Sequence, residues 1–187
     1  WNHPNMPWDG TELWVADLRD DGSVAEQQIV AGGPGESVFQ PEWSPDGTLY
    51  FVSDRTGWWN LYVVHAGEAS PLCPREAEFG GPQWVFGLSR YAFLADGTLI
   101  CSFTRDGCDR LGSLRPGSST LKPFETPFTS HLGGGSVQSD PAGQVYFVGG
   151  SEKRRAAVIG LDPESGHVEV IKAFHTMEID PGYFSTP

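Results

Sequence analysis

Short apolar runs recur along the chain, and each of them follows a turn that ends in glycine. The runs are TLYFVSD, TLICSFT and QVYFVGG. They are rich in β-branched and aromatic residues and too short for typical helices, which favours β-strands. The glycines of the preceding turns, Gly47, Gly97 and Gly143, are spaced by 50 and 46 residues. This spacing indicates an internal repeat.

The copies of the repeat continue in the same order after the apolar run. A polar loop comes next, as SDRTGWWN, FTRDGCDR and GGSEKRRA, and Arg55 and Arg105 hold matching places in the first two. Third strands are predicted at NLYVVH, RLGSLR and AAVIGL, and fourth strands at ASPLCP, TLKPFE and HVEVIKA. TELWVADL and AEQQIVAG resemble the third and fourth strands of an earlier copy. Each complete copy is therefore predicted to hold four antiparallel strands.

A repeat of this length and content is typical of a β-propeller blade, which stacks on its neighbours to bury both faces. We predict an all-β fold, a partial β-propeller of about three and a half to four blades. The predicted parts are a remnant of a blade at 1–33, blades at 34–80, 81–132 and 133–175, and a linker at 176–187. The chain would then begin inside a blade. A β-sandwich is the alternative.

The charge and cysteine content narrow the classes of partner. A formal net charge of −12, from 24 acidic and 12 basic residues, disfavours nucleic acid and anionic membranes, because the protein's field would repel both. Three cysteines without a C-x-x-C pair and five histidines without zinc spacing predict no disulfide framework, no metal site and no cofactor. No apolar run approaches the roughly 20 residues that span a bilayer, and no signal-peptide pattern is present. A cytoplasmic location is expected.

Motifs for covalent catalysis are missing from the sequence. The nearest approach to the nucleophile elbow G-x-S-x-G is GLSRY, which lacks the closing glycine. No histidine is tied by its spacing to a serine and an acid, so each is interpreted as a surface or packing residue. The SPDG turn lacks the D-x-D-x-D-G spacing of a calcium loop. No catalytic residue is therefore predicted in this chain.

Blade topology predicts where binding residues could gather. The loop between the second and third strands of a blade lies at the same end as the connection to the next blade. The turns that end in Gly47, Gly97 and Gly143, which we call the DG turns, lie at the other end. An arginine at the first end could bind a carboxylate, and a tryptophan could offer an apolar surface. The candidates for contact with a peptide or a partner domain are His3, Asn5, Asp9, Glu36, Arg55, Trp58, Trp59 and Arg105.

These candidates also have a purely structural interpretation. Arg55 would then form an ion pair with Asp54, Asp9 or Glu36, and the two tryptophans would pack between blades. Trp43 and Trp84, which lie in QPEW and WVFG, are predicted to begin innermost strands and to belong to the core.

Three segments carry a resemblance to a known family. HPNMPWDGTELW, GGPGESVFQPEWSPDGTLYFVSDRTGWWNLY and EAEFGGPQWVFG resemble the propeller domain of prolyl oligopeptidase family serine peptidases, in the bacterial dipeptidyl- and acylaminoacyl-peptidase-like branch. The similarity covers nearly the whole chain. EIDPGYFSTP resembles the link that leads from the last blade to the catalytic domain. The chain would thus be the C-terminal part of the propeller.

The resemblance implies a function without catalysis in this chain. In the family, the Ser–Asp–His triad lies in an α/β-hydrolase domain that follows the propeller, and the propeller restricts access to short peptides. That domain would be the main partner, and an isolated propeller piece would be catalytically silent. Two alternatives stay open: a free-standing TolB-like propeller that serves as a protein-interaction scaffold, and a propeller lyase or sugar-binding protein, against which the scattered histidines count. Self-association through open propeller edges is also expected.

Overall fold

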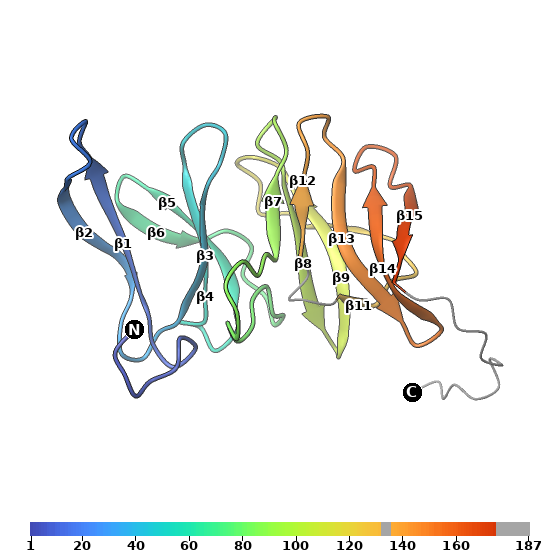
Figure 1. Cartoon of the computed structure of the whole chain (residues 1–187), viewed down its shortest axis with the longest axis horizontal. Helices are drawn as coiled ribbons and strands as arrows, with labels where there is room; N and C mark the ends of the chain where they lie inside the picture. Colours follow the sequence, from blue (N-terminus) through green and yellow to red (C-terminus); the bar gives the residue numbers. More distant parts are fainter. Residues whose placement is uncertain (132–135, 175–187) are drawn as a thin grey trace. The chain divides into compact units, whose positions relative to one another are not determined.

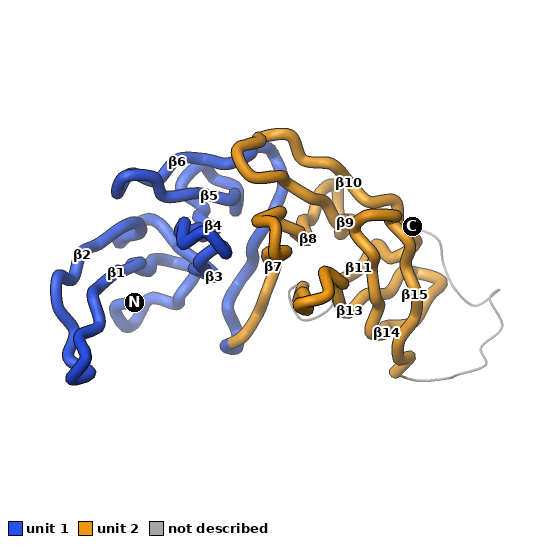
Figure 2. The backbone as a smooth tube through the Cα atoms, turned by 90° about the horizontal axis from the view of Figure 1, so that it is seen from above, with its two compact units in different colours: residues 1–86 blue, residues 87–187 orange. Residues whose placement is uncertain are grey.

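The computed structural model describes residues 1–131 and 136–174, and within them every regular element is a β-strand (Figure 1). The chain divides into two compact units, unit 1 (Trp1–Phe86) and unit 2 (Gly87–Pro187), which are coloured separately in Figure 2. Each unit contains two antiparallel sheets. None of the described residues forms a helix able to cross a membrane.

Unit 1 pairs a two-stranded sheet with a four-stranded sheet. The first consists of β1 (Glu12–Leu18) and β2 (Val24–Gly32), and the second has the order β3-β4-β5-β6. The bounds of the second sheet are β3 (Val38–Trp43), β4 (Leu49–Ser53), β5 (Asn60–His65) and β6 (Glu68–Pro71). Both sheets contribute apolar side chains to one core, which holds Leu13, Ala31, Leu49, Phe51 and Tyr62.

Unit 2 also contains two sheets, which together have more strands than the two sheets of unit 1. One sheet has the order β10-β9-β8-β7, formed by β7 (Tyr91–Phe93), β8 (Leu99–Arg105), β9 (Cys108–Leu114) and β10 (Lys122–Phe124). The other has the order β11-β13-β14-β15, with β12 also paired to β13. Its strands are β11 (Ser130–His131), β12 (Gln138–Ser139), β13 (Val145–Ser151), β14 (Arg154–Leu161) and β15 (Val168–Ala173). The two sheets share a core that includes Ile100, Leu111, Phe147 and Ile159.

The three repeat-defining turns have the same geometry. Gly47, Gly97 and Gly143 have φ angles of 80°, 82° and 85°, and each N–H donates to the carbonyl three residues earlier at 2.9, 2.9 and 3.0 Å. Glycine adopts this left-handed conformation without the steric cost that a Cβ imposes. The repeat seen in the sequence is thus a repeat of hairpins.

The predicted third and fourth strands are confirmed as β5 and β6, β9 and β10, and β14 and β15, and the all-β partial propeller is confirmed as the fold class. The predicted core positions of two tryptophans are wrong. Trp43 ends β3 with 59% of its surface exposed, and Trp84 is 73% exposed in the irregular segment before β7. For Trp43 the reason is the register of β3, in which Phe39, and not Trp43, is the side chain that turns inward. The predicted linker at 176–187 lies outside the described residues.

Candidate functional site

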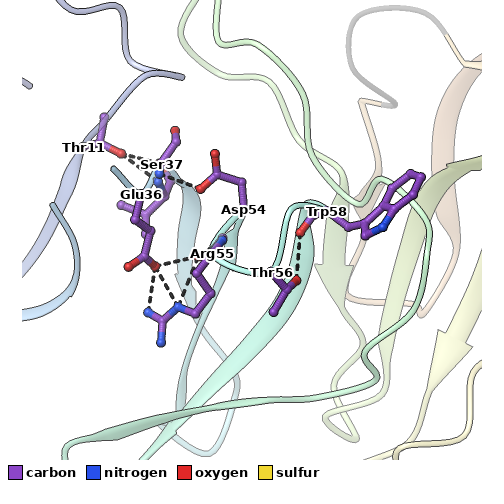
Figure 3. Close-up of polar contacts among 9 residues, drawn as sticks. Thr11, Glu36, Ser37, Asp54, Arg55, Thr56 and Trp58 are labelled. Carbon is purple, nitrogen blue, oxygen red and sulfur yellow. Dashed lines mark hydrogen bonds and ion pairs between the residues drawn. The ribbon is translucent and has the colours of Figure 1, made fainter. Parts of the chain in front are cut away.

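The strongest polar contact among the candidates joins Glu36 to Arg55 (Figure 3). Arg55 Nη2 and Nε lie 2.7 and 2.8 Å from Glu36 Oε1. The hydroxyl of Ser53 donates to the same oxygen at 2.6 Å. Arg55 Cζ also lies 4.7 Å from the ring centroid of Tyr62. Arg55 is thus held at the end of β4 by a carboxylate and by an aromatic face.

Three chain segments meet at this end of unit 1. The N–H of Ser37 donates to Asp54 Oδ1 at 2.7 Å, and its hydroxyl donates to the carbonyl of Pro7 at 2.6 Å. The hydroxyl of Thr11 donates to the carbonyl of Val38 at 3.1 Å. The N-terminal segment, the loop before β3 and the loop after β4 therefore support one another. We call this end of unit 1 the loop end; it comprises residues 1–11, 33–37, 54–59 and 72–86.

The two adjacent tryptophans of the loop end differ in their surroundings. Trp59 is half-buried, and its ring lies edge-on to Phe39, with 6.3 Å between ring centroids. The backbone N–H of Trp59 donates to Glu78 Oε2 at 2.9 Å. Trp58 is 40% exposed and points away from the Arg55–Glu36 pair in Figure 3. Trp59 thus packs within the predicted blade at 34–80, whereas Trp58 exposes apolar surface.

The candidates in the N-terminal segment form local contacts or face solvent. Asp9 Oδ2 accepts a hydrogen bond from the N–H of Met6 at 2.7 Å, which closes a turn. His3 is exposed, and Asn5 is half-buried and donates its N–H to the carbonyl of Asn2 at 3.0 Å. These residues shape the segment that Ser37 holds in place.

Arg105 belongs to unit 2, at the end of β8. Its Nε lies 3.6 Å from Asp106 Oδ2, and its side chain is 59% exposed. An exposed pair of this kind contributes little to stability, because water and salt screen it. Arg105 keeps its guanidinium accessible, unlike Arg55.

One surface that sequence reasoning missed lies at the end of unit 1. Trp84 packs against Trp8 with 4.5 Å between ring centroids, and Val85 and Phe86 are 62% and 96% exposed. Three consecutive large apolar residues outside any strand are the signal that could have revealed this surface. Isolated exposed apolar residues are common, but a contiguous group of them marks a contact site.

A second missed feature is a hydrogen bond between a serine and a histidine in unit 2. Ser102 Oγ lies 2.7 Å from His131 Nδ1, although no sequence spacing relates the two. Both side chains are buried. Asp109 accepts from the backbone N–H of His131 and not from its ring. Among the described residues, the group therefore lacks the ring-to-carboxylate bond of a catalytic triad, and its burial denies access to a substrate.

Two cavities lie away from the candidate residues. A cavity of about 350 Å³ in unit 1 includes Gly47 and Trp43 in its lining, and another of about 840 Å³ in unit 2 includes Asp96 and Gly143. Both lie at the DG-turn ends of the sheets, and no candidate residue lines either of them. Within residues 1–131 and 136–174, no group of three or more histidine, cysteine or acidic side chains could hold a metal ion.

Comparison with known proteins gives matches among solved structures. No family model and no curated protein matches the chain. Puromycin hydrolase is 39% identical with a TM-score of 0.88, and the match covers 98% of this chain and 28% of that one. A puromycin-hydrolyzing peptidase from Mycobacterium tuberculosis is 36% identical with a TM-score of 0.91, and the match covers 100% of this chain and 28% of that one.

A more distant match shows the fold alone. Prolyl oligopeptidase B from Galerina marginata is 12% identical with a TM-score of 0.68, and the match covers 95% of this chain and 24% of that one. This chain thus spans about a quarter of the length of these proteins. Puromycin hydrolase is a peptidase of the prolyl oligopeptidase family, and the matched region is propeller. The chain belongs to the prolyl oligopeptidase family and corresponds to part of its β-propeller domain.

Proposed function

We propose that this chain is the non-catalytic, substrate-selecting part of a serine-type peptidase that acts on short peptides. The observation that carries the proposal is the 39% identity to puromycin hydrolase over 98% of the chain. The sequence lacks a nucleophile elbow. The bond-breaking residues would lie in an α/β-hydrolase domain that follows the propeller, which would be the main partner of this segment.

Selection would be exerted by the loop end of unit 1. Its loops are fixed by hydrogen bonds, such as those of Ser37 to Asp54 and Pro7, and fixed loops lose little entropy when they bind. Trp58 and Phe86 expose apolar surface, which suits the apolar side chain of a peptide. Arg55 is a weaker candidate for binding a substrate carboxylate, because Glu36 already occupies its guanidinium.

The specificity of the proposed peptidase is dipeptidyl or acylaminoacyl, as the family resemblance implies. Puromycin is the first substrate to test, since two relatives are named for its hydrolysis. A panel of aminoacyl, dipeptidyl and acyl-aminoacyl chromogenic amides would then rank the alternatives. Hydrolysis of none of them by the complete protein would contradict the proposal. The free-standing scaffold stays a prediction, which no contact among the described residues favours.

The selecting role can be tested with single variants of the complete protein. Trp58→Ala and Phe86→Ala should each raise KM for a substrate with an apolar side chain about fivefold, which corresponds to about 1 kcal/mol of lost binding, and should change kcat little. Trp43→Ala is the matched control, because Trp43 is an exposed tryptophan at the end of β3 outside the loop end. Equal effects of the Trp43 and Trp58 substitutions would argue against selection by the loop end.

The cytoplasmic location also remains a proposal. It is supported by Cys73, Cys101 and Cys108, which are all free thiols, because free thiols are typical of reducing compartments. Cell fractionation of the natural source would test it, and recovery in an exported fraction would contradict it.

A further inference from the structure

A buried polar network joins the two sheets of unit 2. Ser102 lies on β8 and His131 on β11, so the 2.7 Å contact between Ser102 Oγ and His131 Nδ1 connects sheet β7–β10 to the sheet that contains β13. Ser102 is fully buried, and His131 is 6% exposed. The imidazole also packs against Phe147 of β13, with 5.0 Å between ring centroids. His131 is therefore a side chain through which the sheets contact each other.

Asp109 adds a second connection at the same place. Its Oδ2 accepts a hydrogen bond from the backbone N–H of His131 at 2.7 Å, and its own N–H donates to the carbonyl of Thr129 at 2.8 Å. Its Oδ1 accepts from the hydroxyl of Thr104. Asp109, near the start of β9, thus holds the backbone of 129–131, and Ser102 of β8 holds the imidazole.

Arg90 supplies the positive charge that balances Asp109. Its Nη1 donates to Ser102 Oγ at 3.3 Å and lies 3.7 Å from Asp109 Oδ1, and its Nη2 donates to Thr104 Oγ1 at 2.8 Å. The side chains of Arg90 and Asp109 are 8% and 16% exposed. The network therefore contains one cation and one anion when His131 is neutral, and a protonated His131 would add an unbalanced buried charge.

A proton added to the imidazole of His131 would place a charge in a buried site. Nε2 is buried and has no hydrogen-bond partner among the described residues. Burial lowers the pKa of His131 below its ordinary value, and Arg90 acts in the same direction, whereas Asp109 and the backbone of Phe128 act in the opposite direction. Arg90 and Asp109 are thus the charged groups among the described residues that act on the imidazole. The neutral form is thus the one that the folded network accommodates.

We propose that His131 is an acid-sensitive latch between the two sheets of unit 2. At neutral pH the uncharged imidazole shares a hydrogen bond with Ser102 and the junction is closed. In acid a proton from solvent binds the ring nitrogen that lacks one, the cation lies beside Arg90 in a buried site, and strand β11 separates from β8 and β9. Because the unfolded chain takes up this proton more readily than the folded chain, the stability of the junction is full above about pH 6.5. It declines as the pH falls from there toward the lower pKa of the folded state.

Hydrogen exchange of the full chain tests the latch. Between pH 7.5 and 5.5, and after correction for the pH dependence of intrinsic exchange, we expect protection of the amides of 129–131 and 147–150 to fall about tenfold. The amides of β4 and β5 in unit 1 should keep their protection and provide an internal control. His131→Asn is the matched variant, because the asparagine amide can replace Nδ1 opposite Ser102 and does not titrate. In this variant the two pH values should give equal protection.

Two results would overturn the proposal. One is a fall in protection of the same size in His131→Asn, which would assign the acid effect to another group. The other is an ordinary titration of His131, followed by NMR of the imidazole signals of the wild-type chain. The chain has five histidines, and we expect the signal of His131 to have the lowest midpoint. This measurement needs no folded variant and therefore decides the matter even if His131→Asn is unstable.

Discussion

At the scale of single residues, one oxygen atom organises the loop end of unit 1. Glu36 Oε1 accepts hydrogen bonds from Ser53 and from Arg55, and Ser53 is fully buried. Removing the acceptor of a buried hydroxyl lowers the stability of the fold by more than an exposed ion pair raises it. Glu36 therefore contributes to the fold chiefly through Ser53, and its pairing with Arg55 is the structural interpretation that the sequence left open.

Packing around Trp59 gives the first prediction at this scale. A Cβ added to Gly80 would lie 2.9 Å from a ring carbon of Trp59, whereas one added to Gly81 would meet nothing within 4 Å. Gly80→Ala should lower the free energy of unfolding by about 1–3 kcal/mol, because the indole must leave its site beside Phe39. Urea denaturation measures this loss. Gly81→Ala is the matched control, and equal midpoints for the two variants would refute the close contact.

At the scale of elements, the hairpins were predictable and the burial of their aromatic residues was not. The run after Gly47 has the length and the β-branched and aromatic content typical of a strand, and the turn before it needs a left-handed residue, so both follow from neighbouring residues. Whether Trp43 or Phe39 faces the core depends on the register of β3 against β4 and on the packing of β1 and β2. The contact of Ser102 with His131 likewise joins residues that no local pattern relates.

The DG turns give a prediction for an element. Gly47 has a φ of 80° and open space around it, and Gly35 has open space without a positive φ. Gly47→Ala should therefore destabilise the protein by about 1 kcal/mol through backbone strain alone, whereas Gly35→Ala should be close to neutral. Thermal unfolding of both variants measures the difference. Gly47→Asn should recover part of the loss, because asparagine tolerates the left-handed region, and the absence of any recovery would contradict the assignment to strain.

At the scale of the whole molecule, each unit exposes apolar side chains on one of its two sheets. In unit 1, Trp14 and Ile29 are cross-strand partners on β1 and β2 and are 50% and 53% exposed. In unit 2, Val170, Ile171 and Phe174, on and just after β15, are 53%, 49% and 48% exposed. Blades in a propeller cover such faces by stacking. The repeat in the sequence predicted that such faces need a stacking partner, but it could not show which side chains are exposed.

These faces predict that the 187-residue chain associates with itself, most simply through the Trp14–Ile29 pair, because burying the exposed half of each side chain contributes about 1 kcal/mol. Static light scattering over a range of concentrations should show a mass above that of the 20.4 kDa chain. Replacing both residues with serine should lower the association, whereas Trp58→Ser, which changes an exposed tryptophan at the loop end of unit 1, should not. A monomer at the highest concentration would show that these faces do not drive association. Equal masses for the wild-type chain and the double variant would assign the association to another surface, of which the loop end with Trp84 and Phe86 is the next to test.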